Sequence, residues 1–86
     1  MLLTFKTNTT PFMRIEVTQT TLKVLEVLDH RAMRIILPER CWSLSGLETM
    51  LQFYMNKKQP LDTLLADIKE NGIHCDFQHN LKIDID

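Results

Sequence analysis

The stretch from Gln59 to Phe77, QPLDTLLADIKENGIHCDF, constrains the fold more than any other part of the chain. Apolar side chains recur there at the spacing of one helical face, at Leu61, Leu64, Leu65 and Ile68. Pro60 suits the first helical position, because its ring presets φ and the missing N–H would have no intrahelical partner there. Asn71 or Gly72 can adopt the left-handed conformation that ends a helix. The stretch therefore predicts an amphipathic helix from Pro60 to Asn71.

A period-two pattern follows this helix. Ile73, Cys75 and Phe77 alternate with polar residues, as the side chains of a half-buried strand do. At the start of the chain, residues 1–7 and 13–17 alternate in the same way on either side of the turn-forming cluster 8–11, NTTP. These two runs predict an antiparallel hairpin.

The middle of the chain predicts three more elements. Residues 19–29 carry apolar side chains over a wide arc behind a Thr-rich cap, which we interpret as a buried helix. The apolar run Met33–Leu37, stopped by Pro38, predicts an inner strand. A second amphipathic helix starts at Ser43 or Ser45 and ends at residues 56–58, and Gly46 weakens it unless something packs closely there. The short connection to the next helix predicts an antiparallel helix pair.

Together these elements predict one domain over residues 1–86, of the α+β class. The order is ββαβααββ, with a small mixed or antiparallel sheet and helices on one face. The last strand is expected from Leu81, Ile83 and Ile85, and the alternative is a flexible acidic end over 79–86.

Composition limits the functional classes. The formal net charge is −1, which gives no global drive toward nucleic acid or an anionic membrane. No stretch approaches the length of apolar residues that a membrane helix needs. The two cysteines, Cys41 and Cys75, suggest free thiols in a reducing compartment, so we expect a cytoplasmic protein with no bound cofactor.

Several segments of the chain resemble a small uncharacterised proteobacterial family, domain of unknown function number eighteen-forty. Residues 1–7, MLLTFKT, are similar to the family's ML-x-x-FK-S/T start, and Leu25 and Leu28 stand in its apolar helix. Residues 35–39, IILPE, resemble its G-x-I-x-P-E segment, with Arg34 near the usual glycine. Residues 60–65, PLDTLL, followed by Gly72, Ile73 and Phe77, resemble its closing motif.

The resemblance covers residues 1–77, with two departures. The Ala/Glu-rich spacer of the family is reduced here to residues 56–59, and the tail 78–86 runs past the usual end. The resemblance implies a bacterial protein and supports the fold, but it implies no activity, cofactor or catalytic residue.

The segment 74–79, HCDFQH, is the one candidate for a metal site, through His74, Cys75 and His79. Histidine and cysteine are the ligands that zinc prefers. However, neighbouring residues on a strand point to opposite faces, and paired Cys-x-x-Cys motifs are absent. We favour a core thiol flanked by surface polar groups.

Two clusters are candidates for contacts with a partner. Arg31, Arg34 and Arg40 could bind an anionic partner, although ion pairs with Asp29 and Glu39 are the favoured interpretation. Aromatic residues and methionine are enriched at protein interfaces, and here they are Trp42, Met50, Phe53, Tyr54 and Met55. Core packing is the favoured interpretation for the last two of these residues, which leaves Trp42, Met50 and Phe53 as interface candidates.

The sequence contains no recognisable catalytic motif. With Gly46 and Gly72 as the two glycines, it lacks a glycine-rich phosphate loop, and no nucleophile motif surrounds Ser43 or Ser45. We therefore expect a non-catalytic protein-interaction or regulatory module, with an unknown protein or a second copy of the chain as the partner. A small metal- or ligand-binding protein is the alternative, and an enzyme is the third choice.

Overall fold

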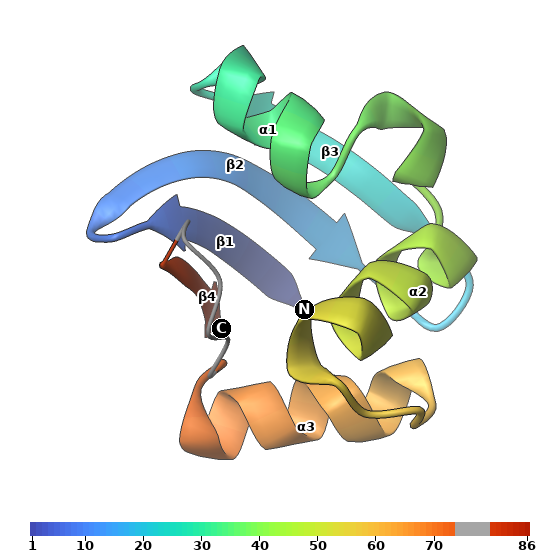
Figure 1. The fold of residues 1–86 in the computed structure, drawn as a ribbon. Helices are drawn as coiled ribbons and strands as arrows, with labels where there is room; N and C mark the ends of the chain where they lie inside the picture. Colours follow the sequence, from blue (N-terminus) through green and yellow to red (C-terminus); the bar gives the residue numbers. More distant parts are fainter. Residues whose placement is uncertain (74–79) are drawn as a thin grey trace.

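The computed structural model describes residues 1–73 and 80–86, which form four strands, three α-helices and one 3-10 turn (Figure 1). The strands are β1 (Leu2–Thr7), β2 (Thr10–Val17), β3 (Leu22–Val27) and β4 (Leu81–Ile85). The helices are α1 (His30–Ile36), α2 (Leu44–Met55) and α3 (Leu61–Asn71), with the 3-10 turn η1 (Glu39–Cys41) between α1 and α2.

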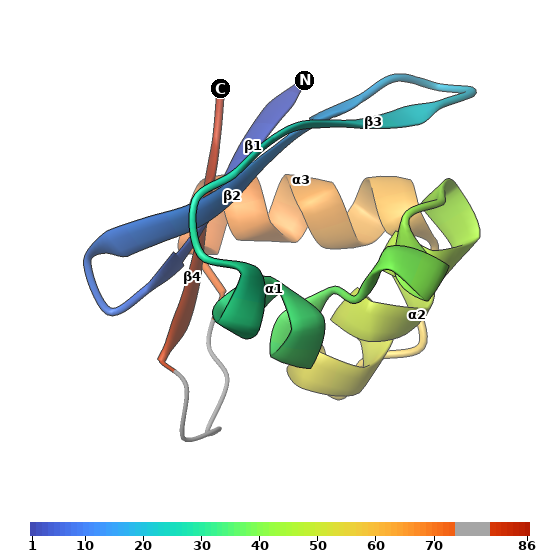
Figure 2. The same ribbon diagram turned by 90° about the horizontal axis from the view of Figure 1, so that it is seen from above.

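The strands form one antiparallel sheet in the order β3-β2-β1-β4, and the helices lie on one side of it (Figure 2). Phe5 of β1, Ile15 of β2 and Ile83 of β4 are buried under the helices, whereas Arg14 and Asp84 are exposed on the other face. This alternation is expected for an antiparallel sheet with one solvated face. The α+β class and the placement of the helices on one face are confirmed.

The two ends of the described chain meet in the sheet. Strand β1 pairs with both β2 and β4, so Phe5 lies opposite Met13 on one side and Ile83 on the other. Leu81 and Ile83 are 2% and 5% exposed, because they enter the core beside β1. Residues 81–85 therefore form a strand where the last strand was predicted.

The predicted helix over 19–29 is wrong, because residues 22–27 form strand β3. The Thr18 hydroxyl accepts a hydrogen bond from the Thr21 backbone N–H at 3.0 Å, which closes the turn that joins β2 to β3. A bulge in β3 explains the error. Ile15 pairs with Val24 and Arg14 pairs with Glu26, so Leu25 has no opposite residue. The extra residue shifts the apolar pattern out of period two and makes it look helical.

The predicted inner strand Met33–Leu37 is also wrong, because most of it belongs to helix α1. The carboxylate of Asp29 accepts hydrogen bonds from the backbone N–H groups of Arg31 and Ala32, at 3.0 and 3.2 Å, and so caps the helix. The buried side chains Met33, Ile36 and Leu37 have the i, i+3, i+4 spacing of a helical face. The observed order of elements along the chain is therefore β1, β2, β3, α1, η1, α2, α3 and β4.

Helices α2 and α3 both form as predicted, but they run in the same general direction and not antiparallel (Figures 1 and 2). The N–H of Leu61, at the start of α3, donates to the carboxylate of Glu48, near the start of α2, at 2.9 Å. The connection 56–60 runs back along α2 to make this possible. Five extended residues can span the length of such a helix, about 18 Å.

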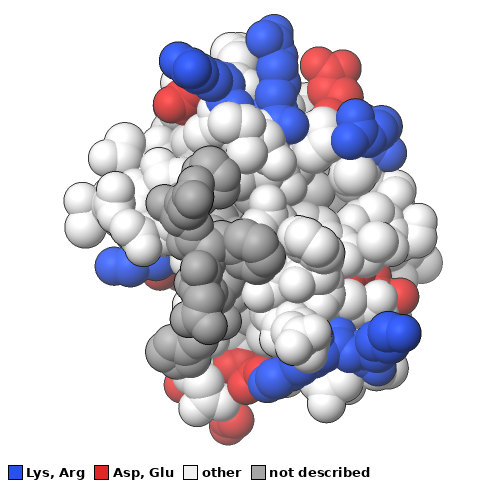
Figure 3. Space-filling model, viewed as in Figure 1, with Lys and Arg blue, Asp and Glu red and all other residues white. Residues whose placement is uncertain are grey.

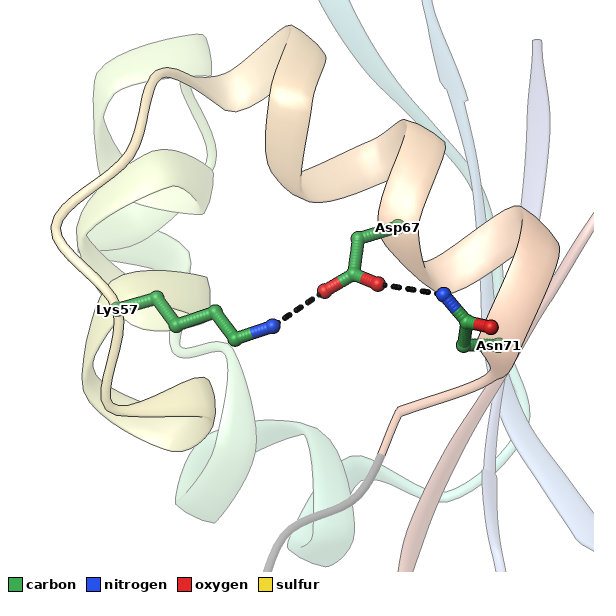
Figure 4. Close-up of polar contacts among 3 residues, drawn as sticks. All are labelled: Lys57, Asp67 and Asn71. Atoms are coloured by element: carbon green, nitrogen blue, oxygen red, sulfur yellow. Dashed lines mark hydrogen bonds and ion pairs between the residues drawn. The ribbon is translucent and has the colours of Figure 1, made fainter.

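Polar contacts hold this connection to α3 (Figure 4). The ammonium group of Lys57 lies 2.6 Å from a carboxylate oxygen of Asp67, and the Asn71 amide donates to the other oxygen at 2.8 Å.

At the ends of the two helices, Asn56 and Gly72 have positive φ values, 53° and 74°. The predicted stop at Gly72 is thus confirmed, whereas the predicted strand over 73–77 falls largely on residues 74–79, outside the described residues.

Candidate functional site

The three arginines of the basic cluster lie on the exposed side of α1 and η1. Figure 3 shows Lys and Arg side chains along the upper edge of the molecule, over these elements, above a mostly uncharged surface over α2. The favoured interpretation, that Asp29 and Glu39 pair with the arginines, does not hold. Within residues 1–73 and 80–86, the ion pairs involve Lys6, Arg14 and Lys57, and Asp29 instead caps α1.

The interface candidates Phe53, Met50 and Trp42 occupy different environments. Phe53 is 66% exposed, and its ring meets the edge of the Tyr54 ring with centroids 5.5 Å apart. Met50 is buried in the core, at 7% exposure. Trp42 is half-buried against the core, and its indole N–H donates to the carbonyl oxygen of Leu37 at 2.9 Å. Of the three, Phe53 alone presents most of its side chain to solvent.

A hollow of about 530 Å³ lies between α1, η1 and α2, and we call it the α1–α2 hollow. Its wall includes Arg34, Ile35, Arg40, Cys41, Gly46 and Phe53. The hollow therefore brings members of both predicted clusters together. Arg31 is not part of its wall and lies at a smaller hollow of about 170 Å³, on the other side of Ile35.

Local sequence explains how α2 forms its side of the hollow. Gly46, Met50 and Phe53 follow a helical spacing that places them along one stripe of α2. At Gly46, the first turn of α2 meets the backbone of η1, because a Cβ atom there would stand 2.4 Å from the carbonyl oxygen of Cys41. The close packing that the sequence required around this glycine is thus present. The Ser43 hydroxyl accepts from the Gly46 N–H at 3.0 Å and caps the helix.

The wall of the hollow combines three kinds of groups. Ile35, from α1, and Phe53, from α2, are 52% and 66% exposed, so both offer apolar surface to a ligand. Arg34 and Arg40 supply positive charge, and Ser45 and Thr49 supply hydroxyl groups. The volume lies in the range of ligand sites in proteins. Such a surface can bind an amphipathic ligand with negative charge.

The same wall offers little for catalysis. Cys41 is a free thiol and the one nucleophile of note. Among the described residues that line the hollow there is no His, Asp or Glu to act as a general base for it. In the described part of the chain, no group of three His, Cys, Asp or Glu side chains is placed to hold a metal ion. The metal candidates His74, Cys75 and His79 lie outside the described residues.

Sequence reasoning missed Ile35 and Cys41 as parts of this site. The sequence pattern predicts Ile35 in an inner strand, where its side chain would be buried. The signal that could have placed it on a helix was Asp29, a good N-cap residue just before the apolar spacing of Met33, Ile36 and Leu37. No local signal identifies Cys41, because its position depends on how η1 packs against α2.

Comparison of the chain with protein-family models, with curated proteins and with solved structures finds no match. The resemblance to the proteobacterial family therefore stays a prediction. In residues 1–73 and 80–86, no helix is long and apolar enough to cross a membrane.

Proposed function

We propose that this chain is a non-catalytic protein-interaction module that binds its partner at the α1–α2 hollow. The observation that carries the proposal is the position of Phe53, which is 66% exposed at the edge of a hollow that also contains Ile35 and two arginines. Aromatic and arginine side chains are enriched at the centres of protein interfaces. Exposed apolar side chains that gather at a concave surface mark interaction sites more often than scattered ones do.

The other exposed large apolar residues support this location. Met1, Leu25 and Leu28 are 47–51% exposed, but none of them lines the hollow. Leu25 stands at the bulge of β3, and bulges protect the edges of sheets from unwanted pairing. The hollow is thus the place where apolar exposure coincides with concavity and positive charge.

Two sequence expectations belong to this proposal. The thiol content suggests the cytoplasm as the compartment, and the family resemblance suggests a bacterial cell as the place to seek the partner. A second copy of the chain is the alternative partner. Sedimentation of the purified protein over a range of concentrations distinguishes a self-associating chain from one that needs a different protein.

The test is affinity capture from native lysate with the full-length chain, at low and high salt, followed by mass spectrometry. The variant Phe53→Gln removes the exposed ring and keeps a residue with good helix propensity. Leu25→Thr is the matched control, because it removes a similarly exposed apolar side chain outside the hollow.

We expect one protein to be retained in near-stoichiometric amount by the wild type and by Leu25→Thr, and to be lost with Phe53→Gln. Circular dichroism of each variant checks that it is folded. Retention of the same proteins in the same amounts by the wild type and Phe53→Gln would refute the proposal.

A further inference from the structure

The α1–α2 hollow has features that specify the chemistry of its partner, and we infer that it binds an acidic segment that carries one large apolar side chain. This inference rests on the proposed function. It names the partner's chemical class, which the interaction-module proposal leaves open.

The first argument is the charge of Arg34 and Arg40. Both line the hollow, and in the described part of the chain neither has an ion-pair partner. Asp29, the acid that precedes α1, already accepts hydrogen bonds from two backbone N–H groups. A guanidinium group can bind a carboxylate through two parallel hydrogen bonds, so two such groups at one site suit a segment with several carboxylates.

The second argument is the apolar surface between the two helices. Ile35 and Phe53 are each more than half exposed and come from different helices. A segment of charged residues alone would leave both in contact with water. One aromatic or aliphatic side chain between them would bury all three, and the arginines would remain available to its acidic neighbours.

The chain's own acidic end cannot be this segment. Residues 83–86, IDID, have the required composition, but Ile83 is buried in β4 and the Asp86 N–H donates to the Leu2 carbonyl at 3.0 Å. A second copy would have to remove β4 from its own sheet to offer these residues. We therefore place the acidic segment in a different protein, and self-association through this end of the chain is not part of the inference.

A nucleic acid fits the hollow less well. Phosphate backbones are held by several Lys and Arg contacts at once, whereas two arginines line this hollow and the whole chain has a net charge of −1. Acidic Glu39 also lies exposed beside Arg40 on η1. These features favour short carboxylate contacts over a continuous phosphate track.

Cys41 provides a direct probe of occupancy, because it is a free thiol in the wall of the hollow. In a Cys75→Ser background it is the single cysteine of the chain. The experiment measures the rate at which a small maleimide alkylates Cys41 by mass spectrometry. A ligand that fills the hollow shields the thiol, so at about ten times the dissociation constant the alkylation rate falls about tenfold.

The probes are three short synthetic peptides and one single-stranded oligothymidine. The first peptide consists of Asp and Glu with one central Phe. The second has Ser in place of the Phe, and the third has Lys in place of every acid. We expect the first peptide alone to slow alkylation of Cys41, and we expect high salt to weaken its effect.

Variants then locate the contact. Arg34→Gln together with Arg40→Gln should abolish the protection, whereas Arg31→Gln, on the same helix but outside the wall of the hollow, should preserve most of it. Unchanged protection in the double variant would overturn the inference.

The other outcomes are equally decisive. The acidic-segment inference would be overturned if the Lys peptide protected Cys41 equally well. It would also be overturned if the oligothymidine protected Cys41 in place of the acidic peptide, or if no probe protected it. None of these results would remove the proposed function if capture from lysate still depends on Phe53. Loss of that dependence would refute the proposed function itself.

Discussion

Gly46 lies where the first turn of α2 meets η1, and the space for a side chain there is filled by backbone. A Cβ atom at this position would stand 2.4 Å from the Cys41 carbonyl oxygen and 2.7 Å from its carbon. Backbone cannot move aside as the end of a flexible side chain can. The sequence showed that a glycine in this helix needed a packing reason, and it could not show which segment supplies it.

We predict that Gly46→Ala lowers the free energy of unfolding by about 1–2 kcal/mol. Alanine improves helix propensity by about 1 kcal/mol, but overpacking against a fixed neighbour costs about 1–3 kcal/mol or more. Urea denaturation measures the difference. Ser45→Ala is the control on the same turn and should change the stability by less than about 0.5 kcal/mol, because Ser45 is exposed. A more stable Gly46→Ala would show that η1 does not pack here.

Among the helices and strands, the sequence predicted those in which the apolar residues keep a regular period. The hairpin of β1 and β2, the helices α2 and α3 and strand β4 all occur, because each has a regular apolar period or a clear cap and stop. The two elements assigned to the wrong type lie in 19–37, where the bulge at Leu25 disturbs the apolar period of β3 and α1 has only seven residues. A short apolar run such as Met33–Leu37 fits both a strand and one face of a helix, and tertiary contacts decide between them.

Helix α1 depends on its cap, so we predict that Asp29→Ala costs about 1 kcal/mol of stability. The substitution removes the acceptor for the Arg31 and Ala32 backbone N–H groups. Asp29→Asn keeps an acceptor oxygen and should be close to the wild type. Hydrogen exchange of the α1 amides, measured by NMR, should accelerate in the alanine variant. Equal exchange in the three proteins would mean that Asp29 does not cap this helix.

The start of α3 is held by a side chain from another helix. Pro60 offers no side-chain cap, and the Glu48 carboxylate of α2 accepts from the Leu61 N–H. We predict that Glu48→Ala destabilises the protein by about 1 kcal/mol, although alanine favours helix α2 itself. Glu48→Gln retains an acceptor and should recover most of the loss. Thermal unfolding of the three proteins tests this, and an alanine variant as stable as the wild type would contradict it.

At the scale of the whole molecule, the candidate site depends on tertiary structure. The sequence identified Arg34 and Arg40 as one cluster and Phe53 as part of another, which could be inferred from residue type. Arg34, Arg40 and Phe53 line one hollow because η1 packs against the start of α2 and because α1 is a helix. Met50 and Trp42 could not be sorted from Phe53 beforehand, because all three are large apolar residues and differ mainly in burial.

The way the protein unfolds also depends on contacts across the whole molecule. Strand β4, near the end of the chain, pairs with β1 and joins a core that also contains Met33, Leu47 and Leu64 from the three helices. The sheet and the helices therefore share one core, and the protein should unfold in a single cooperative step.

Ile83→Ala tests this cooperativity, because Ile83 is 5% exposed and far along the chain from Trp42, the single tryptophan. We predict a loss of about 2–5 kcal/mol, the usual cost of truncating a buried isoleucine. Urea transitions followed by far-ultraviolet circular dichroism and by Trp42 emission should shift together. Lys82→Ala, exposed on the same strand, should leave both transitions within about 0.5 kcal/mol of the wild type. If Ile83→Ala moved the circular dichroism transition and left that of Trp42 in place, β4 would be a separate unit that frays without the helices, and the α1–α2 hollow would survive its loss.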